Sequence, residues 1–332
     1  MKEFALEEPA IAKLNIPSPA VLADRLGISL RRLAEAASRA PSFYSPFDLA
    51  ARSRPFQKEP SQKVRHIDCP TGELKAIQRQ IDRVLLHPIL FPPHIFGGVR
   101  SRSILDNASF HLGTSLLITI DIRSCFPTIS NLQIYRTWTS TLGCSARVGA
   151  LLTKLTTFER RLPQGAPTSP SLANLFIWSI DAPIRAECAR IGIRYSTWVD
   201  DLAFSGTRAR EIIELAVRVL AQEHLAVSRS KIKIMGPRAA KLLTGTRLGQ
   251  DKVRAPHDLT SRVRAAIHKV GSGQSLPGSE EAYLKSVRSQ VKHIERLCPD
   301  DVRLLSVDGL DRLETGDEKS GHRRDVPTAI GQ

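Results

Sequence analysis

Carboxylates stand where short apolar runs end, and this placement limits the folds open to the chain. Residues 114–122 read TSLLITIDI, a β-branched and apolar run typical of a buried strand that ends at Asp121. Asp200 and Asp201 separate the runs IRYSTWV and LAFSG, which indicates a hairpin with the acids at its tip. A charge in such a place is costly unless it is paired or binds a cation. If the strands are neighbours, the three acids meet at one edge of a sheet.

Carboxylate oxygens without histidine or cysteine are the ligands that suit Mg²⁺ or Mn²⁺. Two such ions about 4 Å apart can activate a 3′-hydroxyl and stabilise a leaving pyrophosphate. Together with a basic chain, the acids therefore suggest nucleotidyl transfer. The alternative is that Asp200 and Asp201 only make a turn.

The chain is strongly basic, with 48 Lys and Arg against 33 Asp and Glu, a formal net charge of +15. Such an excess favours a polyanionic partner, nucleic acid before an anionic membrane. A basic surface without a partner is the alternative. No apolar run reaches the roughly 20 residues that span a bilayer, and the N-terminal segment does not read as a secretory signal, so we expect a cytoplasmic protein without membrane contact. The five cysteines lack CxxC spacing, which indicates reduced thiols rather than disulfides or a zinc site.

Helical and strand-like segments alternate between residues 63 and 250, which favours an α/β or α+β fold. Residues 18–38 predict two short helices broken at Gly27, which either pack on the main body or form a DNA-reading helix-turn-helix. A proline- and serine-rich connector is expected at 41–60. Residues 169–192 predict one helix capped by Ser169. Basic helices follow Pro256.

Seven segments occur in the order found in reverse transcriptases. They are KVRHIDCPTGELKAIQRQI, GGVRSRSILDNASFH, ITIDIRSCFPTI, LPQGAPTSPSLANL, YSTWVDDLAFSG, SRSKIKIM and LLTGTRL. Residues 60–300 therefore resemble a reverse transcriptase. The NAxxH signal (Asn107, Ala108, His111) and the Thr244-Gly245 pair look like the retron branch.

The resemblance implies roles for the acids. Asp121 would be the first metal ligand with the Ile122 carbonyl beside it, and Asp200 and Asp201 would complete a site for two Mg²⁺ ions, for which Mn²⁺ can substitute. Lys231 matches a lysine proposed to help protonate the leaving pyrophosphate; by itself it reads as a solvated charge at a strand end.

The resemblance also implies a dNTP site. Phe126 would block a ribose 2′-hydroxyl, the group that distinguishes the two sugars. Gln164 and Gly165 would lie against the incoming nucleotide and template, and Arg65 and Lys63 would bind its triphosphate. Taken alone, Phe126 reads as a core residue and Gln164 as a turn residue.

The sequence departs from the family pattern near the primer site. Trp198 and Val199, which would position the primer, replace the usual Tyr and Ala. Only Phe126 remains of the aromatic residues after Asp121, Ser228 stands where Asn is common, and Leu243 begins the motif that ends in Thr244-Gly245. No metal ligand is lost, so we expect an active enzyme.

RNA contacts are expected from three places. Asn107 and His111 either contact RNA or form a buried polar pair that holds their segment to the palm. Thr244 and Gly245 belong to the retron-like signal. The remaining candidates are basic residues of the C-terminal helices: Arg262, Arg264, Lys269, Lys285, Arg288 and Lys292.

The implied fold is α+β, a right-hand polymerase with an RRM-like antiparallel palm sheet and a helical thumb. We expect an N-terminal helical extension at 1–60, fingers with the NAxxH insert at 61–110, the palm at 111–250, a thumb at 251–300, and a C-terminal segment with a mobile tail at 301–332.

The implied function is that of a retron RNA-directed DNA polymerase. It would bind a structured noncoding RNA, prime from an internal 2′-hydroxyl and make a branched RNA–DNA hybrid from dNTPs. It would act in anti-phage defence with a separate effector protein, and a host RNase H would remove the template. The alternatives are a catalytically silent RNA-binding scaffold, a DNA-binding regulator, and a group II intron-like or other defence reverse transcriptase.

Overall fold

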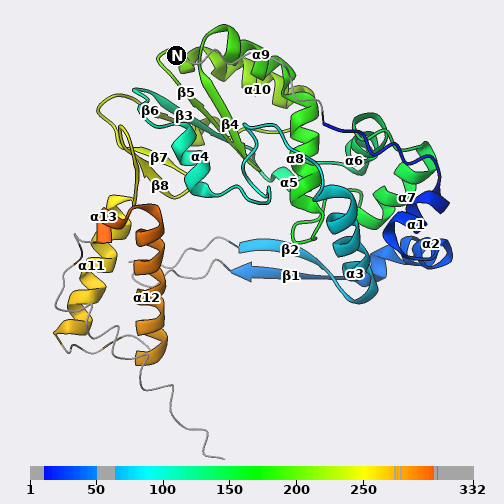
Figure 1. Cartoon of the computed structure of the whole chain (residues 1–332), viewed down its shortest axis with the longest axis horizontal. Helices are drawn as coiled ribbons and strands as arrows, with labels where there is room; N and C mark the ends of the chain where they lie inside the picture. Colours follow the sequence, from blue (N-terminus) through cyan, green and yellow to red (C-terminus); the bar gives the residue numbers. More distant parts are fainter. Residues whose placement is uncertain are drawn as a thin grey trace, which may run out of the picture.

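The computed structural model describes residues 11–50, 64–272, 274, 276, 279–302 and 305. Lys63 and the tail predicted for the C-terminal end lie outside these residues. Figure 1 shows a large body of helices and sheets from which a pair of long helices projects. The sheets are antiparallel and are mixed with helices, which confirms the predicted α+β class. No helix in the described part of the chain is long and apolar enough to cross a membrane.

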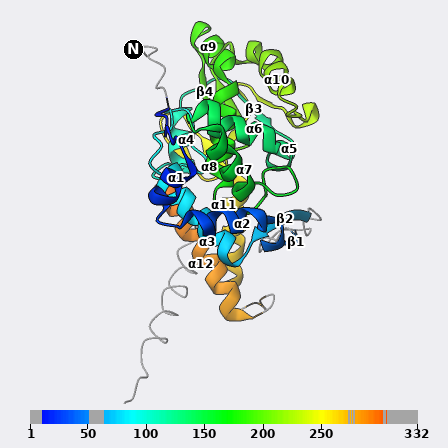
Figure 2. The ribbon, with the colours of Figure 1, turned by 90° about the vertical axis from the view of Figure 1, so that its right-hand side faces the viewer.

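The N-terminal residues fold onto the main body as two helices, α1 (Pro19–Leu26) and α2 (Leu30–Ser38). Gly27 ends α1 with a φ of 63°, a left-handed conformation that glycine adopts without strain. The buried faces of the helices join the core of the main body and pack on α3 (Gly72–Ile81) and α7 (Ala146–Thr156) (Figure 2). The packing alternative predicted for this pair therefore fits the structure.

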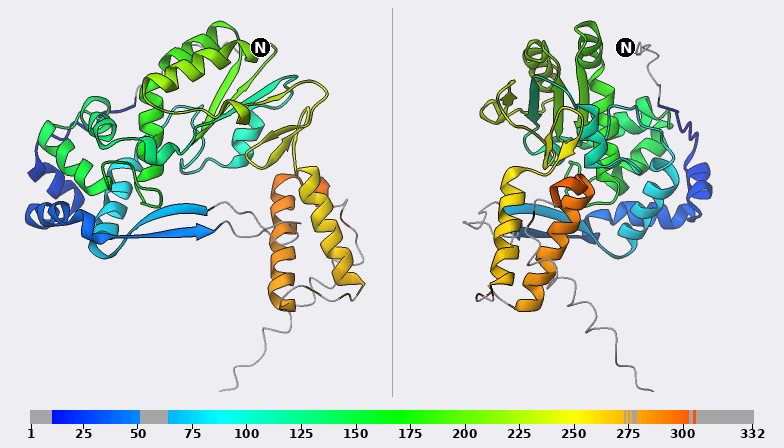
Figure 3. Two further views of the ribbon diagram at one scale, coloured as in Figure 1. Left: turned by 180° about the vertical axis from the view of Figure 1, so that it is seen from behind. Right: turned by 60° about the vertical axis from the view of Figure 1, so that its left-hand side comes forward.

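The segment expected to be a connector is largely structured. After the short helix η1 (Ala40–Phe43), strand β1 (Tyr44–Ala50) pairs antiparallel with β2 (Val64–Pro70). The sequence did not predict strand β1, because Pro46 and the neighbouring serines are typical of a linker. A proline is nevertheless tolerated in a strand whose outer edge is unpaired. The β1–β2 pair extends toward the side of the molecule where the C-terminal helices lie (Figures 1 and 3).

Further helices make up the rest of the main body. They are η2 (Asp82–Leu86), α4 (Ile104–Phe110), α5 (Cys125–Thr128), α6 (Asn131–Arg136), η3 (Thr137–Thr141), α8 (Ser169–Ile180), α9 (Ala182–Arg190), η4 (Ala209–Ile212), α10 (Ile213–Gln222) and η5 (Arg229–Lys231).

Residues 169–192 form two helices, α8 and α9, so the prediction of one helix is wrong. The break falls at Asp181, two residues before Pro183, whose ring cannot continue a preceding helix. Ser169 is not the cap, because α8 already includes it and Thr168 precedes it. The Ser169 hydroxyl instead donates to the Pro163 carbonyl, 2.7 Å away.

The central sheet has the antiparallel order β4-β5-β3-β6, with β4 (Arg194–Trp198), β5 (Asp201–Ser205), β3 (Leu117–Asp121) and β6 (Lys233–Met235). Successive side chains of a strand point to opposite faces. Ile118, Ile120 and Phe204 belong to the large core that includes α8 and α10. Leu117 and Ala203 belong to a smaller core on the other face. Both faces are thus covered at the end of the sheet farthest from Asp121.

The smaller core joins the sheet to a second, three-stranded sheet. This sheet has the order β7-β8-β9, with β7 (Lys241–Leu243), β8 (Thr246–Leu248) and β9 (Val253–Arg254). Leu243, Leu248 and Val253 pack there with Ala108 of α4 and with Met235. The helix α4 is therefore held between the two sheets.

The C-terminal helices have a hydrophobic core of their own. They are α11 (His257–Gly271), α12 (Glu280–Leu297) and α13 (Pro299–Val302). Val263, Ile267, Val287 and Ile294 are fully buried between them. Asp301, which is 2% exposed, accepts hydrogen bonds from the Ala255 amide and the Arg254 guanidinium, both at 2.8 Å. Residue 301 therefore packs with the segment expected as the thumb.

Asn107 and His111 take part in a buried hydrogen-bond network. Their side chains are 1% and 0% exposed, so neither can contact RNA in this fold, and the predicted RNA contact is wrong. The Ser196 hydroxyl donates to Asn107 Oδ1 at 2.7 Å. His111 Nε2 then donates to Ser196 Oγ, and Nδ1 accepts from the Ser205 hydroxyl, each at 2.7 Å. The alternative of a buried polar pair fits, because the network ties α4 to β4 and β5.

Burial, and secondarily the charge of Arg194, lowers the pKa of His111 to about 3. The unfolded chain would protonate a histidine near pH 6.5, so only the unfolded state gains the proton as pH falls below that value. We expect His111 to cost about 1.4 kcal/mol of stability per pH unit below roughly 6.5, down to about 3. Urea unfolding at several pH values should therefore show a weaker acid dependence for His111→Gln than for the wild type.

The control for this prediction is His268→Gln, which changes an exposed histidine on α11. It should keep the wild-type acid dependence. Identical slopes for His111→Gln and the wild type would contradict the burial of a neutral imidazole.

Candidate active site at the edge of the central sheet

Three side chains form a row across the central sheet. Trp198 of β4 pairs in register with Asp201 of β5, and Asp201 pairs in register with Asp121 of β3. The row lies on the face of the sheet that Leu117 and Ala203 share, because residues two and four positions apart in a strand point the same way. At the Leu117 end, α4 and the second sheet cover this face. The carboxylates lie at the opposite end of the same face.

The turn between β4 and β5 consists of Val199 and Asp200. Val199 has a φ of 56°, which is a strained conformation for a β-branched residue. On one side, the Ile122 amide donates to the Asp200 carbonyl at 2.9 Å. This bond joins the end of β3 to the turn and brings Asp200 to the two paired aspartates.

A loop at residues 94–98, which the sequence did not predict, lies on the other side of the turn. The Phe96 amide donates to the Thr197 carbonyl at 2.9 Å, and the Thr197 amide donates to the His94 carbonyl at 2.8 Å. A Cβ atom on Gly97 would lie 2.6 Å from the Val199 nitrogen, so only glycine fits there. The Gly97-Gly98 doublet is a sequence signal for such a close approach of two backbones.

The pKa values of neighbouring groups reflect the three acids at this edge of the sheet. The pKa of Asp201 is raised to about 6, first by burial and then by the charges of Asp200 and Asp121, while Lys233 lowers it. The pKa of the buried Cys125 thiol is raised to about 12 by burial and by the charges of Asp200 and Asp121. Lys231 Nζ lies 3.5 Å from Asp121 Oδ2. The negative charge is therefore concentrated and only partly balanced by lysine.

The donor set suits a hard divalent cation, because all three acids offer carboxylate oxygens. In the part of the chain that the structure describes, no three acid, histidine or cysteine side chains are close enough together to make a finished metal cage. Like charges repel one another, and this repulsion adds to burial in raising the pKa of Asp201. A cation would relieve it. Asp121, Asp200 and Asp201 are therefore the residues that would hold a metal, with Ile122 next to them in sequence.

The residues predicted for a dNTP site occupy two places. Phe126 lies in α5, half-buried against the main core. The Gln164 carbonyl accepts from the Asp68 amide at 2.8 Å, and Gly165, with a φ of 120°, leaves only 2.8 Å between an added Cβ and Ile67. This loop therefore packs on β2. Arg65 is exposed on β2, two residues before Ile67 and on the same face of the strand.

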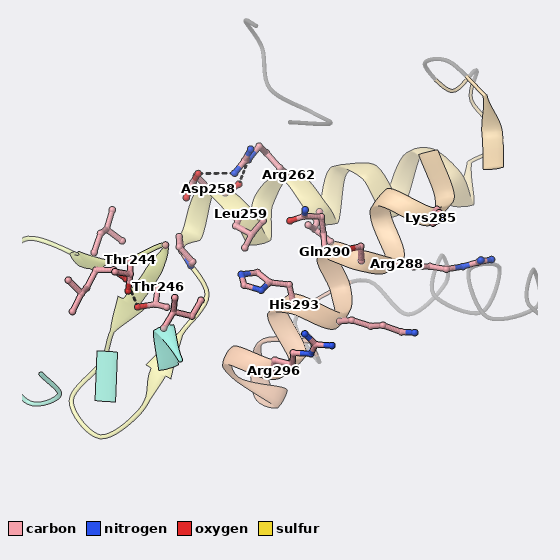
Figure 4. A pocket seen from close by; sticks show the side chains of 18 of the residues that line it. Thr244, Thr246, Asp258, Leu259, Arg262, Lys285, Arg288, Gln290, His293 and Arg296 are labelled. Atoms are coloured by element: carbon pink, nitrogen blue, oxygen red, sulfur yellow. Dashed lines mark hydrogen bonds and ion pairs between the residues drawn. The ribbon is translucent and has the colours of Figure 1, made fainter. Parts of the chain in front are cut away.

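A groove that encloses about 1170 Å³ lies between the β7–β8 hairpin and helices α11 and α12. Six of the residues predicted to bind RNA line it: Thr244, Gly245, Arg262, Lys285, Arg288 and Lys292. Figure 4 shows Thr244 and Thr246 on one wall and Arg288, His293 and Arg296 on α12. Arg264 and Lys269 do not line the groove.

The groove is basic and begins near the carboxylates. Six lysines and arginines line it against two acids, Asp258 and Glu281, and Asp258 already pairs with Arg262 at 3.1 Å. Lys233 of β6 lines the groove and also lowers the pKa of Asp201. Lys233, His293 and Arg296 were not predicted from the sequence, because their part in the groove depends on how the hairpin and α12 are placed.

Comparisons with known proteins show which proteins the chain is similar to. Residues 56–253 match the family "Reverse transcriptase (RNA-dependent DNA polymerase)". The Retron Ec86 reverse transcriptase of Escherichia coli is 31% identical over 222 residues, which cover 66% of this chain and 69% of that protein. The Retron Mx65 reverse transcriptase of Myxococcus xanthus is 28% identical over 268 residues, 73% of this chain and 60% of that protein.

A further relative, the Retron Mx162 reverse transcriptase of Myxococcus xanthus, is 27% identical over 322 residues. That match covers 86% of this chain and 65% of that protein. The chain thus spans between 60% and 69% of the length of these three relatives.

The site predicts a measurable affinity for a divalent cation. Asp121→Asn should weaken Mn²⁺ binding at least about tenfold, or about 1.4 kcal/mol, because it removes one of three converging negative charges. The paramagnetism of Mn²⁺ allows the free ion to be counted by electron paramagnetic resonance. Asp24→Asn, at an exposed position of α1, is the matched control and should bind as the wild type does. Unchanged binding by Asp121→Asn would argue against a metal site here.

Proposed function

The chain belongs to the reverse transcriptase family as a retron-type RNA-directed DNA polymerase, and we propose that its Asp121, Asp200 and Asp201 form the catalytic centre. The observation that carries this proposal is the in-register pairing of Asp121 with Asp201, with Asp200 tied to Ile122 beside them. Three carboxylates from two separate parts of the sequence lie in this way at one sheet edge, and Lys233, which lowers the pKa of Asp201, lines the basic groove.

In the proposed reaction the primer hydroxyl oxygen forms a bond to the α-phosphorus of a dNTP, and the bond from that phosphorus to the pyrophosphate oxygen breaks. Two Mg²⁺ ions, or Mn²⁺ in their place, would supply activation of the hydroxyl and neutralisation of the pyrophosphate charge. Asp121, Asp200 and Asp201 would hold them, with the carbonyl of Ile122 as a further ligand. Lys231, whose Nζ lies 3.5 Å from Asp121 Oδ2, would donate a proton to the leaving pyrophosphate.

Other residues position the substrates. Phe126 blocks a 2′-hydroxyl and so selects dNTPs, while Gln164 and Gly165 border the nucleotide. Arg65, together with Lys63, binds the triphosphate with charge-assisted hydrogen bonds. Trp198 and Val199 support the primer end, since Trp198 lies in the row that contains both paired aspartates.

The basic groove holds the RNA in this proposal. Its walls carry lysine and arginine from α11 and α12 and the turn of Thr244 and Gly245, whose φ angles are 45° and 80°. Thr244 lines the groove, and its buried Oγ1 atom has no hydrogen-bond partner among the described residues. Arg264 and Lys269 of α11 do not line the groove and would contribute only long-range attraction.

The remaining parts of the proposal come from the likeness to retron enzymes. The RNA is a structured noncoding RNA, synthesis is primed from an internal 2′-hydroxyl, and the product is a branched RNA–DNA hybrid. A separate effector protein completes an anti-phage system, and a host RNase H removes the template.

Primer extension on an RNA template with Mg²⁺ and dNTPs tests the proposed function. Asp200→Asn and Asp201→Asn should each lower the rate about 10³-fold, since losing a metal ligand removes roughly 4 kcal/mol of transition-state stabilisation. Asp24→Asn again serves as the control and should extend primers normally. A wild-type protein that binds RNA but extends no primer would identify the noncatalytic scaffold instead.

RNA binding should depend on salt through the lysines of the groove. Removing one phosphate contact lowers the slope of log affinity against log salt by about 1. We therefore expect Lys285→Gln and Lys292→Gln each to weaken binding and flatten the salt dependence in a filter-binding titration. Lys269→Gln, outside the groove, should leave the slope unchanged. Equal slopes for all three variants would mean that the groove does not hold the RNA.

A further inference from the structure

We propose that Asn174 of α8 is a positioning residue for the catalytic turn at residues 198–200, and that it acts through Gly97. The inference rests on the proposed function, because the turn carries Asp200. Asn174 contacts none of the reacting groups. It would set the place of the turn by fixing the loop that lies against it.

Asn174 is buried and makes one directed contact. Its side chain is 1% exposed, and its Nδ2 donates to the Gly97 carbonyl at 2.7 Å. Its Oδ1 has no hydrogen-bond partner among the described residues. A buried amide that uses only its donor leaves its acceptor unpaired, which costs free energy. An apolar side chain would fill the same space without that cost. The hydrogen bond to the Gly97 carbonyl is thus the contact that accounts for an amide here.

Gly97 transmits the contact to the turn. A Cβ atom at Gly97 would lie 2.6 Å from the Val199 nitrogen and 2.7 Å from the Trp198 carbonyl carbon. The two backbones are therefore in contact without any intervening side chain. Gly98 lies close to α8, with an added Cβ 3.0 Å from Pro170 and 3.7 Å from Asn174 Nδ2. The loop is thus fixed between the first turns of α8 and the catalytic turn.

The turn needs such support, because Val199 has a φ of 56° and would relax toward ordinary backbone angles if released. Hydrogen bonds from the loop to Thr197 hold the strand before the turn, and the Ile122 amide holds Asp200 on the far side. Neither contact restricts the position of the Val199 nitrogen. The close approach of Gly97 restricts it, and the hydrogen bond from Asn174 holds Gly97 in place.

The alternative is that Asn174 only stabilises α8. A variant of a neighbouring residue, Ser171, distinguishes this role from the positioning role. Ser171 lies on the same helix, is 7% exposed, and its hydroxyl donates to Asp82 Oδ1 at 3.3 Å, away from the loop. Ser171→Ala removes a buried hydrogen bond from α8 without touching the loop. Asn174→Asp keeps the size of the side chain but places an oxygen where the donor was, opposite the Gly97 carbonyl.

The experiment compares the full-length wild type, Asn174→Asp, Gly97→Ala and Ser171→Ala at a temperature where all four are folded. Amide hydrogen exchange is followed for residues 94–99 and 196–201, and steady-state primer extension gives kcat and the KM for dNTP. We expect faster exchange in both segments and a kcat about 10- to 100-fold lower for Asn174→Asp and Gly97→Ala, with the KM changed less than threefold. Ser171→Ala should exchange as the wild type does in both segments and keep its kcat.

Two results would overturn the positioning role. One is wild-type exchange of residues 196–201 in Asn174→Asp. The other is an equal loss of kcat in Ser171→Ala, which would show that α8 stability alone is at stake. A wild-type chain without polymerase activity would end the proposed function, but the exchange measurement would still test whether Asn174 holds the turn.

Discussion

The pairing register of β3 with β5 is the constraint on which the rest of the site depends. Asp121 opposes Asp201 because Leu117 opposes Ser205 four residues earlier, and the same register puts Ile118 opposite Phe204 in the core. A slip of one residue would move every side chain of the strand to the other face, exposing the isoleucines and burying the aspartates. Hydrophobic burial at Ile118 and Ile120 therefore fixes where the carboxylates stand. The packing of the core therefore determines where the carboxylates lie, while the repulsion between the carboxylates opposes this arrangement.

The sequence predicted the parts of the site that depend on local pattern. The strand ending at Asp121, the acids between two apolar runs and the helices after Pro256 are all present, because strand alternation and helical periodicity are encoded within ten to twenty residues. The assignment of Asn107 and His111 to RNA was wrong for a different reason. Burial depends on which element covers the sheet, and the two serines that satisfy His111 are 85 and 94 residues away in the chain. A histidine four residues after an asparagine is compatible with either role until that packing is known.

Backbone contacts were the least accessible to sequence reasoning. Gly97 and Gly98 have no side chain whose chemistry could indicate a partner, and the partner of Gly97 is the backbone of a turn about 100 residues later. The strand β1 was missed for a related cause, since Tyr44–Ala50 is mostly exposed and lacks the alternation of buried residues that marks a strand. Its pairing with β2 comes from main-chain hydrogen bonds, which almost any sequence can make.

Strand β6 connects the groove with the carboxylates, and the connection has an electrostatic consequence. Thr119 pairs with Lys233, so continuing the register brings Lys231 beside Asp121, where its Nζ is found at 3.5 Å. Lys233, two residues along, lines the groove and stabilises the charged form of Asp201. A phosphate chain that approaches the three acids would be repelled by them. Lys231 at the end of η5 and Lys233 of β6 reduce this repulsion along the path from the groove to the sheet edge. Divalent cations would neutralise the negative charge that remains at the acids.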